Sequence, residues 1–111
     1  MVRINIGDFK MLLHLKGNEL EKIINSNEKV LVDFYADWCN PCKMLGESIE
    51  ELVCEHTEMM VAKVNVEESP EVFEKYKEKS IPLLVMYKNG RIVKKIVGFI
   101  PKGMVWRIYN E

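Results

Sequence analysis

The chain has 111 residues, which suffices for one domain with a single hydrophobic core. Hydrophobic residues make up 48% of the sequence and charged residues 30%, proportions typical of a soluble globular protein rather than a disordered or fibrous one. The 16 basic residues are balanced by 17 acidic ones, so no excess of positive charge is available to bind a phosphate backbone, and nucleic acid is not an expected partner.

The cysteine count and the apolar runs indicate where the protein works. Three cysteines are too few, and an odd number, for the disulfide framework of a small secreted protein. Near the N-terminus, one basic residue, Arg3, and a short apolar run over 11–13 give no recognisable export signal. No stretch approaches the roughly 20 apolar residues that a membrane-spanning helix needs. We therefore expect a soluble, cytoplasmic protein that does not associate with membranes.

The spacing of apolar residues changes several times along the chain, and each change predicts a new element. Val2, Ile4 and Ile6 alternate with polar residues, as in a half-buried strand. The nearly unbroken apolar run from Val30 to Ala36 is typical of a strand that is buried on both faces. In order, we predict a strand over 2–6, a helix over 18–24, a strand over 30–36, a helix after residue 38, a strand over 60–66, a helix from residue 70, strands over 83–87 and 92–97, and a helix over 102–109.

Local signals set the boundaries of these elements. Asn18 and Asn40 are suitable N-caps for the first two helices, and Pro41 fits a first helical turn, where its missing N–H would have no partner. The Asn89-Gly90 pair between two strand-like runs predicts a hairpin. Because strands and helices alternate before this hairpin, we predict one α/β domain over residues 1–111, with a central mixed sheet and helices on both faces.

Cys39 and Cys42 stand where a buried strand leads into a helix. The free N–H groups and the dipole of a helix N-terminus favour negative charge, so they raise the thiolate fraction of a cysteine. The thiolate is the attacking species in disulfide exchange. Cys42 begins the apolar stripe of the helix, whereas Cys39 precedes the helix and is expected to be exposed. We therefore predict that Cys39 attacks a substrate disulfide and that Cys42 resolves the mixed disulfide.

Four segments together resemble the thioredoxin family: VDFYADWCNPC (32–42), SIPLLVMY (80–87), the KNG turn (88–90) and VGF (97–99). They match in order and spacing, and the resemblance covers essentially the whole chain. It implies the thioredoxin fold and a protein dithiol–disulfide oxidoreductase that reduces disulfide-containing protein substrates, with no cofactor and no metal. It also implies an electron donor, either a thioredoxin-reductase-like enzyme or a glutathione-linked system. We expect the protein to be a monomer.

The same resemblance implies roles for residues outside the cysteine pair. Asp33 corresponds to the buried carboxylate behind the pair, Lys63 to its neighbour, and Pro82 to a cis proline that faces the dithiol. A carboxyl group in a buried strand favours its neutral form, which suits Asp33 to accept and return a proton. Trp38, Ile81 and Pro82 are expected to contact the substrate, whose extended chain would pair with backbone groups beside the proline.

Three positions depart from the family pattern. Asn40-Pro41 replaces the usual Gly-Pro between the cysteines, so these two residues are expected to tune the reduction potential. Glu47 replaces the proline that kinks this helix in many members, which predicts a straighter helix. Leu83 replaces the threonine that usually follows the cis proline, which predicts a more apolar substrate groove.

Plainer interpretations of the charged and aromatic residues stay open on the sequence alone. Asp33 could be a satisfied core carboxylate, Lys63 only its partner in the sheet, and Trp38 ordinary packing at a strand end. Cys54 is expected to be a semi-buried thiol without a role.

The cysteine pair also has alternatives. Cys39 and Cys42 could form half of a zinc site, although no recognisable second ligand pair is present, or a structural disulfide without turnover. The same fold would also accommodate a glutaredoxin-like or disulfide isomerase activity, or a binding module that works regardless of redox state. A Cys39→Ser variant that keeps its partner affinity would favour the module.

Overall fold

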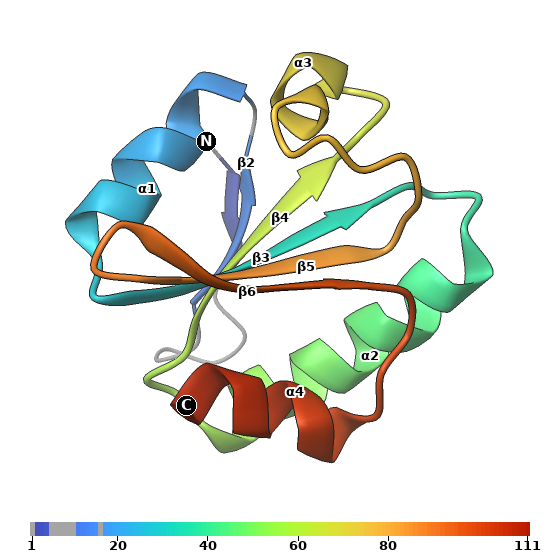
Figure 1. Cartoon of the computed structure of the whole chain (residues 1–111). Helices are drawn as coiled ribbons and strands as arrows, with labels where there is room; N and C mark the ends of the chain where they lie inside the picture. Colours follow the sequence, from blue (N-terminus) through green and yellow to red (C-terminus); the bar gives the residue numbers. More distant parts are fainter. Residues whose placement is uncertain (1, 5–10, 16) are drawn as a thin grey trace.

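The computed structural model describes residues 2–4, 11–15 and 17–111 of the chain. Their elements follow the sequence as β1 (Val2–Ile4), β2 (Met11–Leu15), the short 3-10 turn η1 (Gly17–Glu19), α1 (Leu20–Ser26), β3 (Lys29–Tyr35), α2 (Asn40–Glu55), β4 (Met60–Asn65), α3 (Pro70–Glu74), β5 (Leu83–Lys88), β6 (Arg91–Val97) and α4 (Lys102–Asn110) (Figure 1).

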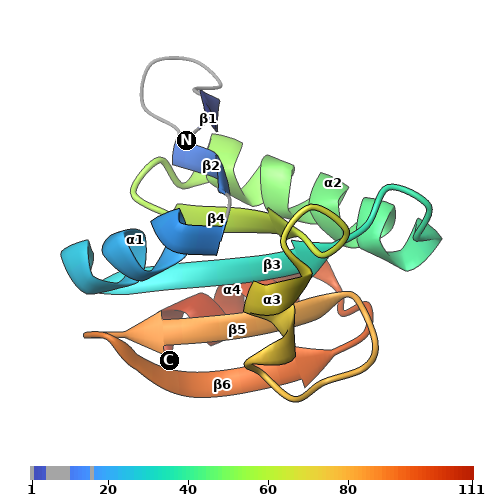
Figure 2. The same ribbon diagram turned by 90° about the horizontal axis from the view of Figure 1, so that it is seen from above.

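The strands form one mixed sheet in the order β1-β2-β4-β3-β5-β6. Strands β2, β4 and β3 run parallel to one another, whereas β1 is antiparallel to β2, β5 to β3 and β6 to β5. Helices α1 and α3 cover one face of the sheet, and α2 and α4 cover the other (Figures 1 and 2). The predicted mixed sheet with helices on both faces is therefore confirmed.

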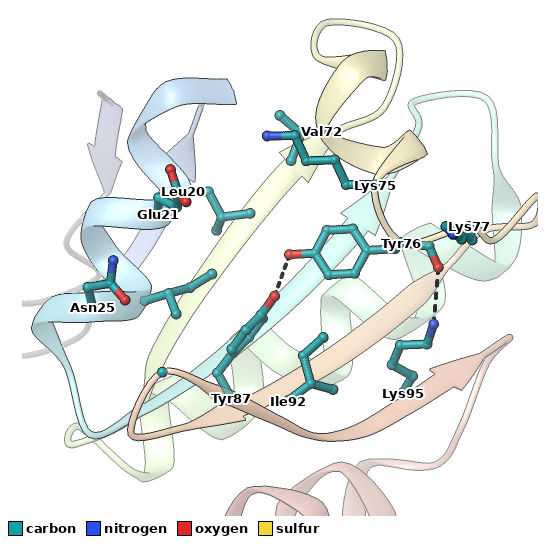
Figure 3. A pocket seen from close by; sticks show the side chains of 12 residues that line it. Leu20, Glu21, Asn25, Val72, Lys75, Tyr76, Lys77, Tyr87, Ile92 and Lys95 are labelled. Carbon is teal, nitrogen blue, oxygen red and sulfur yellow. Dashed lines mark hydrogen bonds between the residues drawn. The ribbon is translucent and has the colours of Figure 1, made fainter.

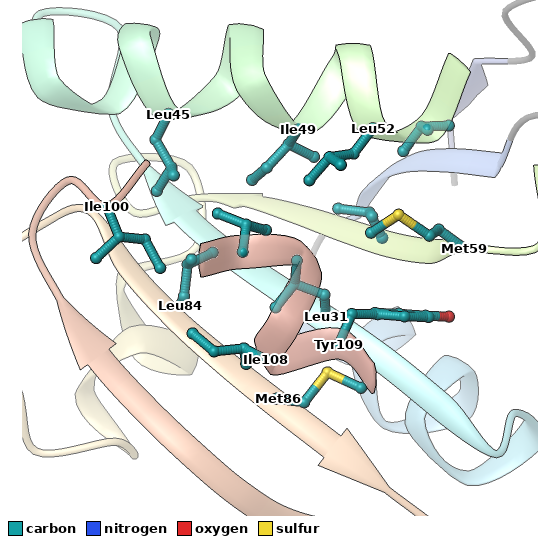
Figure 4. Close-up of a cluster of buried hydrophobic side chains, with 13 residues drawn as sticks. Leu31, Leu45, Ile49, Leu52, Met59, Leu84, Met86, Ile100, Ile108 and Tyr109 are labelled. Carbon is teal, nitrogen blue, oxygen red and sulfur yellow. The ribbon is translucent and has the colours of Figure 1, made fainter. Parts of the chain in front are cut away.

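The central strand β3 is buried on both faces, as its apolar sequence predicts. Successive side chains of a strand point to opposite faces. Val32 and Phe34 accordingly pack beneath α1 and α3, whereas Leu31 joins Leu45 and Ile49 in the cluster beneath α2 and α4 (Figure 4). Each fully buried side chain of this kind contributes about 1.5–3 kcal/mol. Two cores thus fix β3 in place, and with it the residues at its C-terminal end.

Strand β2 is missing from the sequence prediction. The segment MLLHL does not alternate, and the strand exists because it pairs in parallel with β4, with Leu13 opposite Ala62. Such pairing depends on residues far along the chain, which a local pattern cannot show. Of the predicted strand over 2–6, the structure has residues 2–4 as β1, and residues 5 and 6 lie outside the described part of the chain.

Both predicted helix caps are wrong by one residue. Asn18 lies within η1, and Glu19 precedes α1 without capping it through its side chain. Asn40 is itself the first residue of α2, and Cys39 occupies the cap position, where its Sγ accepts a hydrogen bond from the backbone N–H of Cys42. A sulfur thus takes the place that an asparagine oxygen would take, while Pro41 lies in the first turn, as expected.

The predicted hairpin between β5 and β6 is present. Asn89 and Gly90 have φ angles of 53° and 79°. Positive values at both central residues define the type I′ turn, whose twist matches that of the flanking strands. Beyond this turn, β6 forms one edge of the sheet, and its first five residues are all exposed.

Helices α2 and α4 are tied together at their surfaces. Lys102 of α4 bridges Glu51 and Glu55 of α2, with Nζ to oxygen distances of 3.0 Å and 2.6 Å. The His56 and Trp106 rings stack with centroids 3.5 Å apart. Helix α2 runs from residue 40 to residue 55 with Glu47 within it, and its expected straightness stays a prediction. No helix in the described ranges is long and apolar enough to cross a membrane.

Candidate active site

A disulfide joins Cys39 and Cys42 at the start of α2, and their Cα atoms are 5.2 Å apart. The Cys42 amide donates to Cys39 Sγ at 3.2 Å, so an N–H group of the helix N-terminus is already directed at this sulfur. The same donor would stabilise a Cys39 thiolate after reduction. The structure thus brings the two sulfurs together as the spacing predicts.

The expected exposure of Cys39 is wrong. Its side chain is only 5% exposed, compared with 2% for Cys42. The pair packs with Ala36 in a small cluster, against which Val66 and Ile81 lie. Position before the helix therefore does not make Cys39 an exposed residue, because the segments after β4 and before β5 also pack around the disulfide.

Asp33 and Lys63 are direct neighbours in the sheet, one on β3 and one on β4. Lys63 Nζ lies 4.0 Å from Asp33 Oδ2, and neither carboxylate oxygen has a hydrogen-bond partner. Asp33 is fully buried. Burial raises the pKa of Asp33 to about 6, although the Lys63 ammonium acts in the opposite direction. This carboxyl group can therefore take up and release a proton near neutral pH.

A cavity of about 310 Å³ is lined by both Cys42 and Lys63. Lys63 Nζ also lies 4.5 Å from the centroid of the Tyr35 ring, a cation–π contact. A Cβ atom at Gly46 would come within 3.3 Å of Lys63 Nζ, so a glycine leaves room for the ammonium. A cavity thus lies between the buried Cys42 sulfur and Lys63, which is the partner of the buried Asp33 carboxyl group.

Tyr35 and Gly46 are missing from the sequence prediction of the site. Tyr35 follows Asp33 by two residues on a strand, so both side chains face the same side of the sheet. Gly46 follows Cys42 by four residues on a helix, so the two share one helical face. Both periodicities could have identified these residues.

The three expected substrate contacts differ in how far they are exposed. Trp38 is 67% exposed, Ile81 is half-buried against the cysteine cluster, and Pro82 is buried after a cis peptide bond. The Pro82 carbonyl already accepts a hydrogen bond from the Gly98 amide at 2.8 Å, so pairing with an extended substrate would fall to the backbone of Ile81.

Two other expectations are corrected. Leu83 is fully buried in the cluster beneath α1 and α3, so its side chain cannot make a substrate groove more apolar. Strand alternation places Leu83 on the face of the sheet that α1 and α3 cover. Cys54 is exposed in the last turns of α2 rather than semi-buried, because it lies off the apolar stripe of that helix. Asn40 and Pro41 are both exposed in the first turn.

Comparison with known proteins decides the family. Residues 11–109 match the family model described as Thioredoxin. The chain belongs to the thioredoxin family. It is 40% identical over 84 residues to a thioredoxin of Mycoplasmoides gallisepticum, an alignment that covers 76% of this chain and 84% of that protein. It is 43% identical over 90 residues to a thioredoxin of Mycobacterium tuberculosis, with coverage of 80% and 78%.

The fold comparison agrees with the sequence comparison. A mutant thioredoxin from Halobacterium salinarum superposes with a TM-score of 0.83 at 35% identity, over 89% of this chain and 88% of that one. Membership of this thioredoxin family, together with the Cys39–Cys42 disulfide, makes the chain a thiol–disulfide oxidoreductase, an enzyme of a family that acts on protein disulfides.

Proposed function

We propose that this thioredoxin-family protein reduces protein disulfides, with Cys39 as the nucleophile and Cys42 as the resolving thiol. The observation that carries the assignment is the hydrogen bond from the Cys42 amide to Cys39 Sγ at the start of α2. It singles out one sulfur of the pair for stabilisation as a thiolate. Cys42 is buried and lines the cavity that Lys63 also lines.

The reaction takes two exchanges. The Cys39 thiolate attacks one sulfur of the substrate disulfide, the substrate S–S bond breaks, and one substrate thiolate leaves while Cys39 is held in a mixed disulfide. Cys42 then loses its proton and attacks Cys39 Sγ, the mixed disulfide breaks, and the second substrate thiolate leaves. The substrate has gained two electrons, and the protein has lost two in forming the Cys39–Cys42 bond.

Asp33 is proposed to receive the Cys42 proton through the cavity, with Lys63 as the group that holds the carboxyl in a titratable range. The support is the cavity shared by Cys42 and Lys63 and the 4.0 Å separation of Lys63 Nζ from Asp33. A base whose pKa is about 6 in the folded protein is suited to proton transfer near neutral pH.

Substrate docking is assigned to Trp38, Ile81 and Pro82, of which Trp38 and Ile81 reach the surface and the buried Pro82 supplies the cis bond that follows Ile81. An exposed indole beside a buried disulfide supplies apolar contact area at the reacting sulfur. Asn40 and Pro41, which lie exposed between the two cysteines, are proposed to set the reduction potential, where about 30 mV corresponds to about 1.4 kcal/mol.

After each turnover the Cys39–Cys42 disulfide must be reduced again, which requires two electrons from a donor. We propose that the donor is a thioredoxin-reductase-like enzyme or a glutathione-linked system in the cytoplasm. Insulin reduction with NADPH distinguishes these donors: one arm contains thioredoxin reductase, and the other contains glutathione with glutathione reductase. We expect turnover in at least one arm. Activity with dithiothreitol but in neither arm would contradict the proposed donors.

Three cysteine variants test the roles of the sulfurs in the same assay. Cys39→Ser should abolish insulin reduction, whereas Cys42→Ser should accumulate a mixed disulfide that is visible on a non-reducing gel. Cys54→Ser is the matched control and should retain the parental rate. If Cys42→Ser formed no adduct while Cys39→Ser did, the two assignments would have to be exchanged.

A further inference from the structure

A second cavity, larger than the first, lies on the opposite face of the sheet (Figure 3). Its volume is about 510 Å³, within the range of about 300 to 1,000 Å³ that is typical of small-molecule sites. Residues of α1, of α3 and the segment after it, and of the β5–β6 hairpin line it. Its apolar lining consists of Leu20, Ile24, Val72 and Ile92.

Two tyrosine hydroxyl groups meet inside this cavity. The hydroxyl oxygens of Tyr76 and Tyr87 are 2.7 Å apart, so one hydroxyl donates to the other. Burial raises the pKa of both phenols, which keeps both hydroxyls protonated at neutral pH. The pair therefore holds two hydrogens but uses only one of them in its own hydrogen bond. The second hydrogen is a donor for which the described residues provide no acceptor.

The charged residues around the cavity are mostly basic. Lys75, Lys77 and Lys95 line it, against one acidic lining residue, Glu21. The Lys95 ammonium is engaged, because it donates to the Tyr76 carbonyl at 3.0 Å and lies 3.3 Å from Glu78. In the described part of the chain, the Lys75 and Lys77 ammonium groups form neither an ion pair nor a hydrogen bond. The unused hydroxyl hydrogen and the two lysine ammonium groups are thus donors, and two of these three carry positive charge, whereas Glu21 and Asn25 add acceptor oxygens to the lining.

We propose that this cavity binds a small amphipathic carboxylate. Its apolar part lies on Leu20, Ile24 and Ile92, and its carboxylate accepts the spare hydroxyl hydrogen of the tyrosine pair and faces Lys75. A carboxylate fits because it only accepts hydrogen bonds and carries the charge opposite to that of the lysines, whereas an ammonium ligand would leave the hydroxyl hydrogen and both free lysines unpaired and would have Glu21 as its one oppositely charged lining residue. The site shares no lining residue with the cavity at the disulfide, so the proposal does not depend on the assignment of the redox residues.

Three ligands with the same carbon skeleton test the chemistry: 3-phenylpropionate, 3-phenyl-1-propanol and 3-phenylpropylamine. Each is titrated into the oxidised, isotope-labelled protein and followed by amide chemical shifts. We expect saturable shifts around Tyr76, Tyr87 and Ile92 with the carboxylate, at a Kd of about 1 mM or tighter. The alcohol should bind at least about 10-fold more weakly. Equal shifts with all three ligands, no saturation, or shifts confined to Trp38 and Ile81 would overturn the proposal.

Variants test the named contacts. Tyr87→Phe removes a hydroxyl and should weaken 3-phenylpropionate binding about 10-fold, and Lys75→Gln should weaken it about 3-fold. Lys94→Gln, an exposed lysine of β6 that does not line the cavity, is the matched control and should bind as the parent does. All three variants should reduce insulin at the parental rate. Because Lys75 is exposed, its replacement leaves the fold intact, and unchanged affinity in both Tyr87→Phe and Lys75→Gln would refute the assignment.

Discussion

The carboxyl group of Asp33 couples folding to proton binding. Its pKa is about 6 in the folded protein against an ordinary value of 3.8, because burial disfavours the charged form. Below pH 4 the group is protonated whether the chain is folded or unfolded. Between about pH 4 and pH 6 only the folded protein keeps the proton, so stability falls as the pH rises through this window. Above pH 6 the folded protein must hold a buried charge, and the loss of stability is complete.

Asp33→Asn should therefore stabilise the protein at pH 7, because the amide cannot ionise. The difference between 3.8 and about 6 corresponds to at most about 3 kcal/mol. Urea unfolding at pH 7 and at pH 4 measures the effect, which should disappear at the lower pH. Asp37→Asn, which changes an exposed carboxylate nearby, is the control. A gain of stability that is equal at both pH values would show that proton binding to Asp33 is not its cause.

The three thiols of the reduced protein should react at different rates. Cys39 has the Cys42 amide directed at its sulfur, whereas Cys42 is buried. Cys54 lies near the far end of α2, where no N–H group of the helix start can reach it. We expect iodoacetamide at pH 6 to label Cys39 at least about 10-fold faster than the other two. Peptide mapping by mass spectrometry measures the three rates, and faster labelling of Cys54 would contradict the electrostatic argument.

Elements with strong local signals could be predicted from the sequence, and those that depend on distant partners could not. The hairpin at Asn89-Gly90 and the double burial of β3 follow from residues that are adjacent in the chain. Strand β2 exists through its pairing with β4, and its sequence alone does not distinguish it from a loop. The sequence predicts Asn40 as the N-cap of α2, whereas the structure has Cys39 there, with its sulfur as the hydrogen-bond acceptor. Cysteine is not among the residues that N-cap preferences favour, so the sequence could not show this.

The segment that follows α3 contains a residue in an unfavourable backbone conformation. Lys77 has a φ angle of 58°, and its amide donates to the Glu74 carbonyl at the end of α3. Lys77 lies two residues after the C-cap Lys75, and a left-handed residue just past the end of a helix is usually a glycine. Lys77→Gly should increase the free energy of unfolding by about 0.5–1 kcal/mol, since the relief of the left-handed strain exceeds the entropy that the glycine adds to the unfolded chain.

Urea unfolding of Lys77→Gly measures this gain. Lys79→Gly is a matched control, because Lys79 is equally exposed and has no positive φ angle. It should lose stability or leave it unchanged. Equal losses in both variants would mean that Lys77 carries no backbone strain.

At the scale of the whole molecule, the two cores share the sheet and should unfold together. Ile49 is fully buried beneath α2 and α4, and its replacement by alanine should cost about 2–5 kcal/mol. If the chain is one cooperative domain, far-UV circular dichroism and tryptophan fluorescence of Ile49→Ala will show the same urea midpoint with an unchanged slope. Separate transitions would indicate that the α2–α4 layer unfolds independently of the α1–α3 layer.

The site was predictable where its chemistry lies in adjacent residues. Cys39 and Cys42 follow from their spacing, and Asp33 from its place in an apolar run. The sequence did not show how tightly Cys39 is packed, because Val66 and Ile81 come from other parts of the chain. Nor did it show which face of β5 carries Leu83, since the strand is apolar on both sides and has no alternation to read.

The exposed edge at β6 has a consequence for the protein at high concentration. Ile92, Val93 and Val97 are exposed there beside Arg91 and Lys94. An unpaired strand edge can pair with the same edge of another copy, but two basic edges repel each other. Salt shortens the range of this repulsion from about 10 Å at 0.1 M to about 3 Å at 1 M. Sedimentation velocity should therefore show reversible self-association that increases with ionic strength. Lys94→Val should make this self-association begin at a lower salt concentration. If self-association of the variant began at the same salt concentration as that of the parent, the charges of β6 would not be what keeps the molecules apart.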